Sequence, residues 1–188
     1  MASGWFSLLS VPLPPFSSQC IIVSHVERYS FFLFFKAWAL QANHGGGYSY
    51  RLCPASEPLT EECFQRMPLA FVGNQTLRWG GEKGDRFSYK GTYVTEGTTP
   101  AGSMWSMNPI PRNDVDQTGV GFKQRCPAGV TGRPCSGGTE TGLGNLEIVD
   151  VIQIPAGTPE GNYVLGWRWD CEESNQIWSS CSDVTIAA

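Results

Sequence analysis

The sequence is poor in charge, in histidine and in long apolar runs. Only 16% of its 188 residues are charged and the formal net charge is −4, so no basic stripe is available to bind nucleic acid. No window approaches the ~20 continuous apolar residues of a membrane-spanning helix, so we expect no stable membrane insertion. No glycine-rich phosphate loop occurs, and we therefore expect no nucleotide ligand. The only two histidines are His25 and His44.

Glycine, proline and aromatic residues are abundant, and they indicate many short strands joined by turns. The length suits one domain that can build its own hydrophobic core. Alternating or apolar runs predict strands at 36–41, 48–52, 69–72, 76–79, 87–94, 146–155, 163–169 and 183–186. The fold class we predict is all-β: an antiparallel β-sandwich of the immunoglobulin-like or fibronectin-like type, incomplete and with long loops.

Six of the seven cysteines form three close sequential couples. Zinc is the competing explanation, but none of the couples has a Cys-x-x-Cys spacing and no histidine lies within a few residues of them. We predict disulfides, an oxidising compartment, and hence an extracellular or secretory-pathway location. The predicted pairs are Cys53–Cys63, Cys126–Cys135 and Cys171–Cys181, with Cys20 left unpaired. The triplet Asn74-Gln75-Thr76 is a glycosylation sequon, which is compatible with secretion.

Residues 1–35 differ from the remainder of the chain. They lack an early Lys or Arg, and Pro12, Pro14 and Pro15 interrupt their apolar stretch, so they satisfy the requirements of a signal peptide only weakly. We therefore separate a segment 1–35, a weak signal or an aberrant sequence, from a domain 36–188.

The stretch around His44 is the centre of the functional interpretation. His44 and three glycines directly precede an alternating run in which Tyr48, Tyr50 and Leu52 share one face of a strand. This pattern places a metal-competent imidazole at the end of a strand. The alternative is that His44 is simply a turn residue.

The His44 motif, followed by Leu52-Cys53-Pro54 and then Glu62-Cys63-Phe64, resembles the copper-dependent lytic polysaccharide monooxygenases, notably the eukaryotic chitin- and cellulose-active group. The segment 176–184, Gln-Ile-Trp-Ser-Ser-Cys-Ser-Asp-Val, carries the same resemblance, which extends over residues 36–186. In that family copper is held in a T of three nitrogens, from an N-terminal histidine and a second histidine. The resemblance makes His44 the second arm. The first has no match, and we expect a truncated or aberrantly spliced relative.

The resemblance also suggests roles for two residues near the C-terminus. Trp178 occupies the family's axial aromatic position, where an indole would shield the metal or pass an electron; a core tryptophan beside a Cys171–Cys181 bond is the alternative. Gln176 corresponds to a glutamine that hydrogen-bonds near the oxygen, with an exposed loop residue as the alternative. Cleavage after Ser24 would expose His25 as a new N-terminal histidine, but an ordinary solvent-facing histidine is the better interpretation.

The function that the resemblance implies is copper-dependent oxidative cleavage of chitin, cellulose or a similar polysaccharide, impaired in this chain because one arm of the copper site is missing. A non-catalytic extracellular carbohydrate-binding module is the second hypothesis. In that case Tyr48, Trp105, Trp167 or Trp169 would stack on sugar rings. A fragment without a function of its own is the third. We take Tyr48 and Trp105 as the candidate substrate-binding residues.

Overall fold

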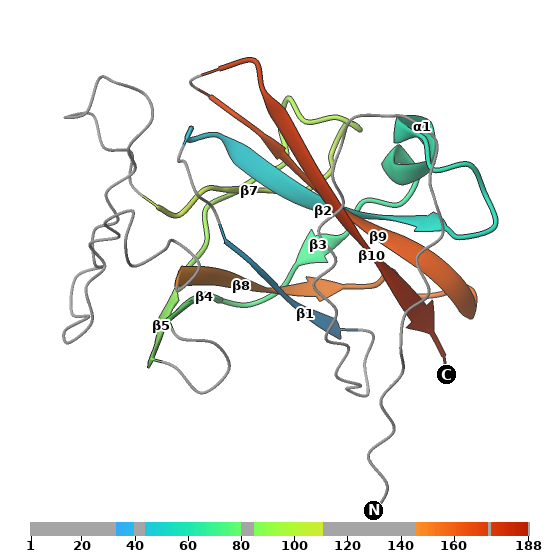
Figure 1. Cartoon of the computed structure of the whole chain (residues 1–188), viewed down its shortest axis with the longest axis horizontal. Helices are drawn as coiled ribbons and strands as arrows, with labels where there is room; N and C mark the ends of the chain where they lie inside the picture. The colour runs from blue at the N-terminus through green and yellow to red at the C-terminus, as the bar shows by residue number, and fades with distance from the viewer. Residues whose placement is uncertain (1–32, 40–43, 80–84, 111–145, 173, 188) are drawn as a thin grey trace, which may run out of the picture.

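Ten β-strands and one short α-helix make up the part of the chain that the structure describes. This computed structural model describes residues 33–39, 44–79, 85–110, 146–172 and 174–187 (Figure 1). The first elements are β1 (Leu33–Trp38), β2 (Gly47–Pro54), α1 (Glu61–Gln65), β3 (Ala70–Phe71), β4 (Gln75–Trp79), β5 (Asp85–Tyr89), β6 (Tyr93–Val94) and β7 (Trp105–Met107). The last are β8 (Leu146–Gln153), β9 (Gly161–Asp170) and β10 (Ile177–Ile186). The predictions about Cys20, His25 and the Cys126–Cys135 pair lie outside the described residues.

The strands form two antiparallel sheets. One has the order β1-β8-β4-β5, with β3 also pairing with β8, and the other has the order β10-β9-β2-β7-β6. Figure 1 shows β2, β9 and β10 running obliquely across the strands of the first sheet. The predicted all-β antiparallel sandwich is therefore confirmed.

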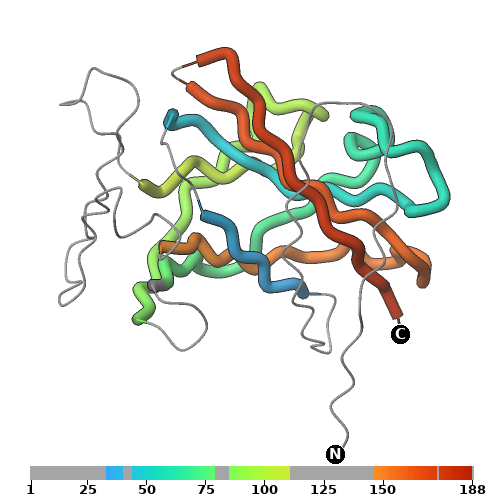
Figure 2. Tube along the Cα trace, viewed as in Figure 1, coloured from blue at the N-terminus to red at the C-terminus, as the bar shows by residue number. Residues whose placement is uncertain are grey.

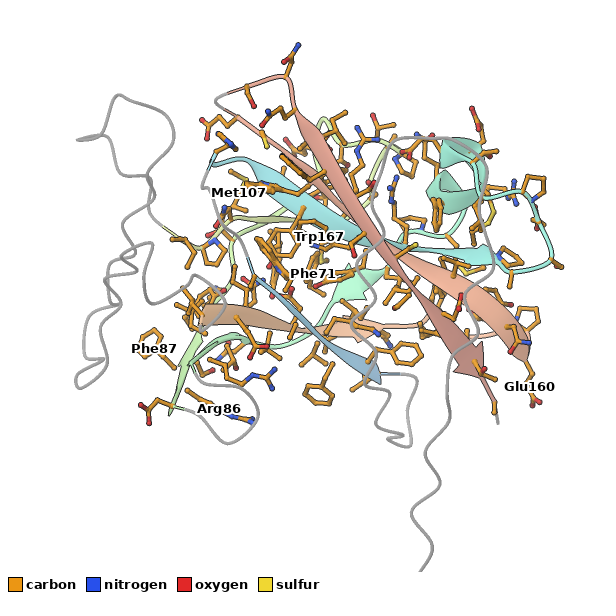
Figure 3. The ribbon with its side chains drawn as sticks, viewed as in Figure 1. Phe71, Arg86, Phe87, Met107, Glu160 and Trp167 are labelled. Carbon is orange, nitrogen blue, oxygen red and sulfur yellow. A yellow bond between two sulfur atoms is a disulfide. The ribbon has the colours of Figure 1, made fainter. Side chains whose placement is uncertain are left out.

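The core lies between the sheets and is built from alternate residues of β2, β8 and β9. Its buried members include Tyr48, Tyr50 and Leu52 of β2, Leu146, Ile148 and Ile152 of β8, and Tyr163, Leu165 and Trp169 of β9. Figure 3 shows Phe71 and Trp167 in the middle of the molecule and Arg86 and Glu160 at its periphery. The period-two pattern thus predicted the inner faces of these three strands correctly.

Two strands, β1 and β10, begin well before the residues at which we predicted their starts. β1 begins at Leu33 rather than at Lys36 and pairs with β8 from its first residue. β10 begins at Ile177 rather than at Asp183 and pairs with β9 along its whole length. The first half of β10 is rich in serine, and backbone hydrogen bonds rather than apolar side chains hold it in the sheet. A hydrophobic pattern could not indicate such a strand.

The predicted strand 87–94 is two strands that belong to different sheets. β5 pairs with β4 in one sheet, and β6 pairs with β7 in the other. The chain crosses between them at Gly91, where an added Cβ would lie 2.4 Å from Gln75 Oε1. Glycine allows this close approach of the backbone to the Gln75 side chain.

The helix α1 was not predicted. The Thr60 hydroxyl accepts a hydrogen bond from Cys63 N at 3.3 Å, and Glu61 and Glu62 lie in the first turn, where acidic side chains are favourable. Cys63 is bonded to Cys53 of β2, as predicted, and this bond pins the helix to the sheet. No helix in the described residues is long and apolar enough to cross a membrane.

Candidate functional site

His44 lies just before β2, where its backbone is hydrogen-bonded to the hairpin that joins β9 to β10. Its carbonyl oxygen accepts a hydrogen bond from Glu172 N at 3.0 Å. Gly46 has φ +77°, and a Cβ added there would lie 2.0 Å from the carbonyl oxygen of Asp170. Both the backbone conformation and the lack of space therefore require glycine at this position. The position of the His44 backbone is fixed by the hairpin rather than by the loop alone.

The half-buried His44 ring faces Trp169 of β9. The two ring centroids are 6.2 Å apart, with an angle of 30° between the ring planes. The Trp169 indole N–H donates to Gly45 O at 2.7 Å, which holds the indole beside the loop. Among the described residues, no hydrogen bond engages the His44 imidazole. Its nitrogens are therefore available as metal donors.

Trp178 is the direct partner of Trp169 across the β9–β10 pairing. Residues paired in this way lie on the same face of a sheet, so Trp178 is next to the indole that faces His44. Trp178 is 52% exposed, which excludes the alternative of a core tryptophan. It offers a broad apolar ring to solvent at the end of the sandwich.

Gln176 lies in the β9–β10 hairpin, where its carbonyl oxygen accepts a hydrogen bond from Cys171 N at 3.1 Å. The side chain of Gln176 is exposed. Figure 2 shows the start of β2 and this hairpin at the same end of the molecule. The fold thus brings His44, Trp169, Gln176 and Trp178 together, and we call these four residues the His–Trp site.

Within the described residues, the His–Trp site supplies one metal donor. No group of three or more His, Cys, Asp or Glu side chains that could hold a metal ion occurs there. A T of three nitrogens needs two donors besides the His44 imidazole. Among the described residues, only one of the three donors that such a T requires is therefore present.

The prediction that Tyr48 contacts a sugar is wrong. Its side chain is fully buried, at 0% exposure, and it points into the core because β2 places Tyr48, Tyr50 and Leu52 on the inner face. The Tyr48 hydroxyl donates to Asp150 Oδ1 at 3.0 Å and the Tyr50 hydroxyl donates to Asp150 Oδ2 at 2.9 Å. Tyr48 is therefore part of the hydrogen-bonded core of the domain and cannot stack on a ligand.

Asp150 is the centre of a buried polar network. Besides the two tyrosine hydroxyls, the Gln75 amide donates to Asp150 Oδ1 at 2.6 Å and to Ser106 Oγ at 2.9 Å. Burial raises the pKa of Asp150 to about 6, and the hydrogen bonds from Gln75, Tyr50 and Tyr48 partly oppose this increase. Burial also raises the pKa values of Tyr48 and Tyr50 well above their usual range, so both stay protonated donors.

We did not predict the burial of Asp150, although the sequence carried the signal. Leu146, Ile148 and Ile152 alternate along β8, and Asp150 occupies the inward position between them. A carboxylate at an inward position of an apolar strand must be hydrogen-bonded in the folded protein. The alternation therefore implied that hydrogen-bond donors surround the Asp150 carboxylate, although the sequence could not identify these donors on β2 and β4.

Trp105 lies on the outer face of its sheet, whereas Trp169 and Trp178 lie on the inner face. The guanidinium of Arg168 is 5.9 Å from the Trp105 ring centroid. Two hydrogen bonds to Asp170, of 2.6 and 2.9 Å, and one to Glu61 of 2.8 Å fix that guanidinium. Trp105 is thus an ordered, partly exposed aromatic residue outside the His–Trp site.

The predicted Cys171–Cys181 disulfide is absent. Cys171 is a free thiol, whereas Cys181 is disulfide-bonded. Cys171 lies beside Gln176 at the top of the hairpin, and Cys181 is paired with Gly166 further down. Five residues of strand separate the two levels by roughly 16 Å, whereas a disulfide requires Cα atoms within about 7 Å. Proximity in sequence was misleading because the two residues belong to one extended hairpin.

Comparison with known proteins found no matching family model, no matching curated protein and no matching solved structure.

Proposed function

We propose that this chain acts on an insoluble polysaccharide of the chitin or cellulose type, as an extracellular domain that resembles the copper-dependent lytic polysaccharide monooxygenases. It binds the polymer through the His–Trp site, and His44 serves as one ligand of a copper ion used for oxidative cleavage. The Cys53–Cys63 disulfide supports an oxidising compartment.

The observation that carries the proposal is the placement of His44 next to the Trp169–Trp178 pair. The two motifs of the resemblance are separated by about 130 residues in the sequence, yet hydrogen bonds and ring contacts bring them to one end of the sandwich. The His44 imidazole is a metal donor, and Trp178, the strand partner of the indole that faces it, adds a flat, exposed apolar surface. Such a surface suits the face of a sugar ring.

Copper, when bound, would supply the activation of oxygen or peroxide. His44 would hold the ion through its imidazole. Trp169, whose ring packs against that imidazole, would fix its orientation. Trp178 would cover the approach to the ion and orient the polymer. The other donors are not among the described residues, so on these residues alone we expect weak binding of copper.

A non-catalytic carbohydrate-binding domain is the second candidate. Trp178 is 52% exposed, which is unusual for a large apolar residue and favours a binding surface. Under this hypothesis polymer binding would require Trp178 but would be independent of His44 and copper.

Sedimentation of the protein with chitin and with cellulose, with and without Cu(II), tests both candidates. Trp178→Ala should reduce the bound fraction at least several-fold, and Trp178→Phe should retain most of it because the ring face is kept. Phe35, which is 46% exposed on the other sheet, provides the matched control, and Phe35→Ala should bind like the unchanged protein.

His44→Ala separates the two candidates. If copper increases the bound fraction of the unchanged protein and not that of the variant, the copper-site interpretation is supported. Equal binding by both proteins, with and without copper, would favour the non-catalytic domain. Unchanged binding by Trp178→Ala would contradict both.

A further inference from the structure

We propose that Asn74 is an N-glycosylation site, located on an edge of the molecule that the His–Trp site does not use. Asn74-Gln75-Thr76 is the single Asn-x-Ser/Thr sequon in the 188 residues. The proposal is independent of the polysaccharide function, because it depends only on the passage of the chain through a secretory compartment. The Cys53–Cys63 disulfide supports such a passage.

The turn between β3 and β4 presents Asn74 to solvent. Asn74 is exposed, and the preceding Gly73 has φ +70° with no atom within 4 Å of an added Cβ. The Tyr93 hydroxyl donates to Gly73 O at 3.2 Å and holds the turn in place. Asn74 is thus a solvent-exposed residue in an ordered turn, with open space beside the residue before it.

The alternation of β4 separates the sequon from the core. Gln75 is buried and donates hydrogen bonds to Asp150 and Ser106. Residues on either side of an inward-facing strand residue point outward, so Asn74 and Thr76 lie on the solvent side. A glycan on Asn74 therefore leaves the buried polar network undisturbed.

The glycan would also leave the His–Trp site open. The hydrogen bond from Tyr93 places the Asn74 turn next to β6, which is one edge strand of its sheet, whereas Trp178 belongs to β10 at the other edge. Four strand spacings separate these edges, which corresponds to about 19 Å. A modification at Asn74 is therefore compatible with a ligand at Trp178.

The chain contains a closely matched control. Asn175-Gln176-Ile177 has the same first two residues and an exposed asparagine, but isoleucine replaces the threonine that the modification requires. If exposure alone decided glycosylation, both asparagines would be modified. The proposal instead predicts a glycan on Asn74 only.

The test is to direct the full chain through a eukaryotic secretory pathway with a cleavable leader and to map its peptides by mass spectrometry. All leader-cleaved protein, secreted and retained, is analysed before and after treatment with a peptide-N-glycosidase, so a folding defect does not obscure the result. We expect most of the Asn74 peptide to carry a glycan. Thr76→Ala should abolish it, Thr76→Ser should retain it, and Asn175→Gln should have no effect. An unmodified Asn74 in the leader-cleaved chain would overturn the proposal.

Discussion

Gln75 and Asp150 meet in the core on neighbouring strands, and the Gln75 amide donates to the Asp150 carboxylate at 2.6 Å. With the hydroxyls of Tyr48 and Tyr50, this contact surrounds a fully buried carboxylate with donors from both sheets. The core of the sandwich is therefore joined by a polar network as well as by apolar packing.

The pKa of Asp150 predicts that the domain becomes less stable as the pH rises. Burial raises this pKa from 3.8 to about 6, so between these values the folded state holds a proton that the unfolded state releases. The contribution is fully present below pH 3.8 and is lost as the pH rises through about 6, and it amounts to about 3 kcal/mol. Urea unfolding at pH 4.5 and pH 7 should show about 2 kcal/mol of this loss, because the rest has already been lost at pH 4.5.

The control for this prediction is Asp150→Asn, which has no proton to bind at this position. The stability of the unchanged protein should fall more steeply between the two pH values than that of the variant. Equal pH dependence of the two proteins would contradict the assignment of the effect to Asp150.

Tyr50→Phe removes one donor from the buried carboxylate. We expect a loss of about 2 kcal/mol in the free energy of unfolding, because the remaining charge stays buried with an unmet oxygen. Tyr163→Phe is the matched control, since the Tyr163 hydroxyl donates only to the neutral carbonyl of Pro159 at 2.9 Å. It should cost about 1 kcal/mol. If Tyr50→Phe cost no more than the control, the network would not have the importance we assign to it.

The free thiol of Cys171 can be detected by chemical labelling. In the native protein a thiol reagent should modify Cys171, while Cys53, Cys63 and Cys181 should react only after reduction. Peptide mapping without reductant should give a Cys53–Cys63 peptide. A peptide that joins Cys171 to Cys181 would show that the β9–β10 register is not the one described.

Gly46→Ala should separate the His44 loop from the hairpin. The new Cβ would be forced against Asp170 O, which is 2.0 Å from its ideal position, so we expect a loss above about 2 kcal/mol and weaker polysaccharide binding. Gly157→Ala is the control, because Gly157 has a similar φ of +84° but no atom within 4 Å of an added Cβ. It should cost only about 1 kcal/mol, the cost of the left-handed conformation. Equal losses, measured by urea unfolding, would mean that contact with the hairpin does not hold the loop.

Most of the fold could be predicted from the sequence, because its main strands alternate clearly. Tyr48 and Tyr50 share a face with Leu52 as expected, and Tyr163 to Trp169 alternate into the core. The pattern failed where packing does not determine the structure. The serine-rich start of β10 is held by its neighbour, and α1 depends on its Thr60 cap and on the Cys63 disulfide.

The candidate site was predictable only in part. The resemblance assigned His44, Gln176 and Trp178, and the fold brings these three residues to one end of the molecule. The inward direction of Tyr48 followed from its alternation with Leu52, but we expected it to contact a sugar because aromatic side chains often do. The roles of Trp169 as a support for His44 and of Asp150 as a buried hub depend on contacts between distant strands, which one sequence does not reveal.

Calorimetric titration with Cu(II) tests the assignment of His44 most directly. The account predicts weak binding by the full chain, because a single imidazole holds Cu(II) far less tightly than two imidazoles and an amine do. His44→Ala should abolish this binding and His25→Ala should leave it unchanged. Tight binding that requires His25, or binding that survives the loss of His44, would contradict the account.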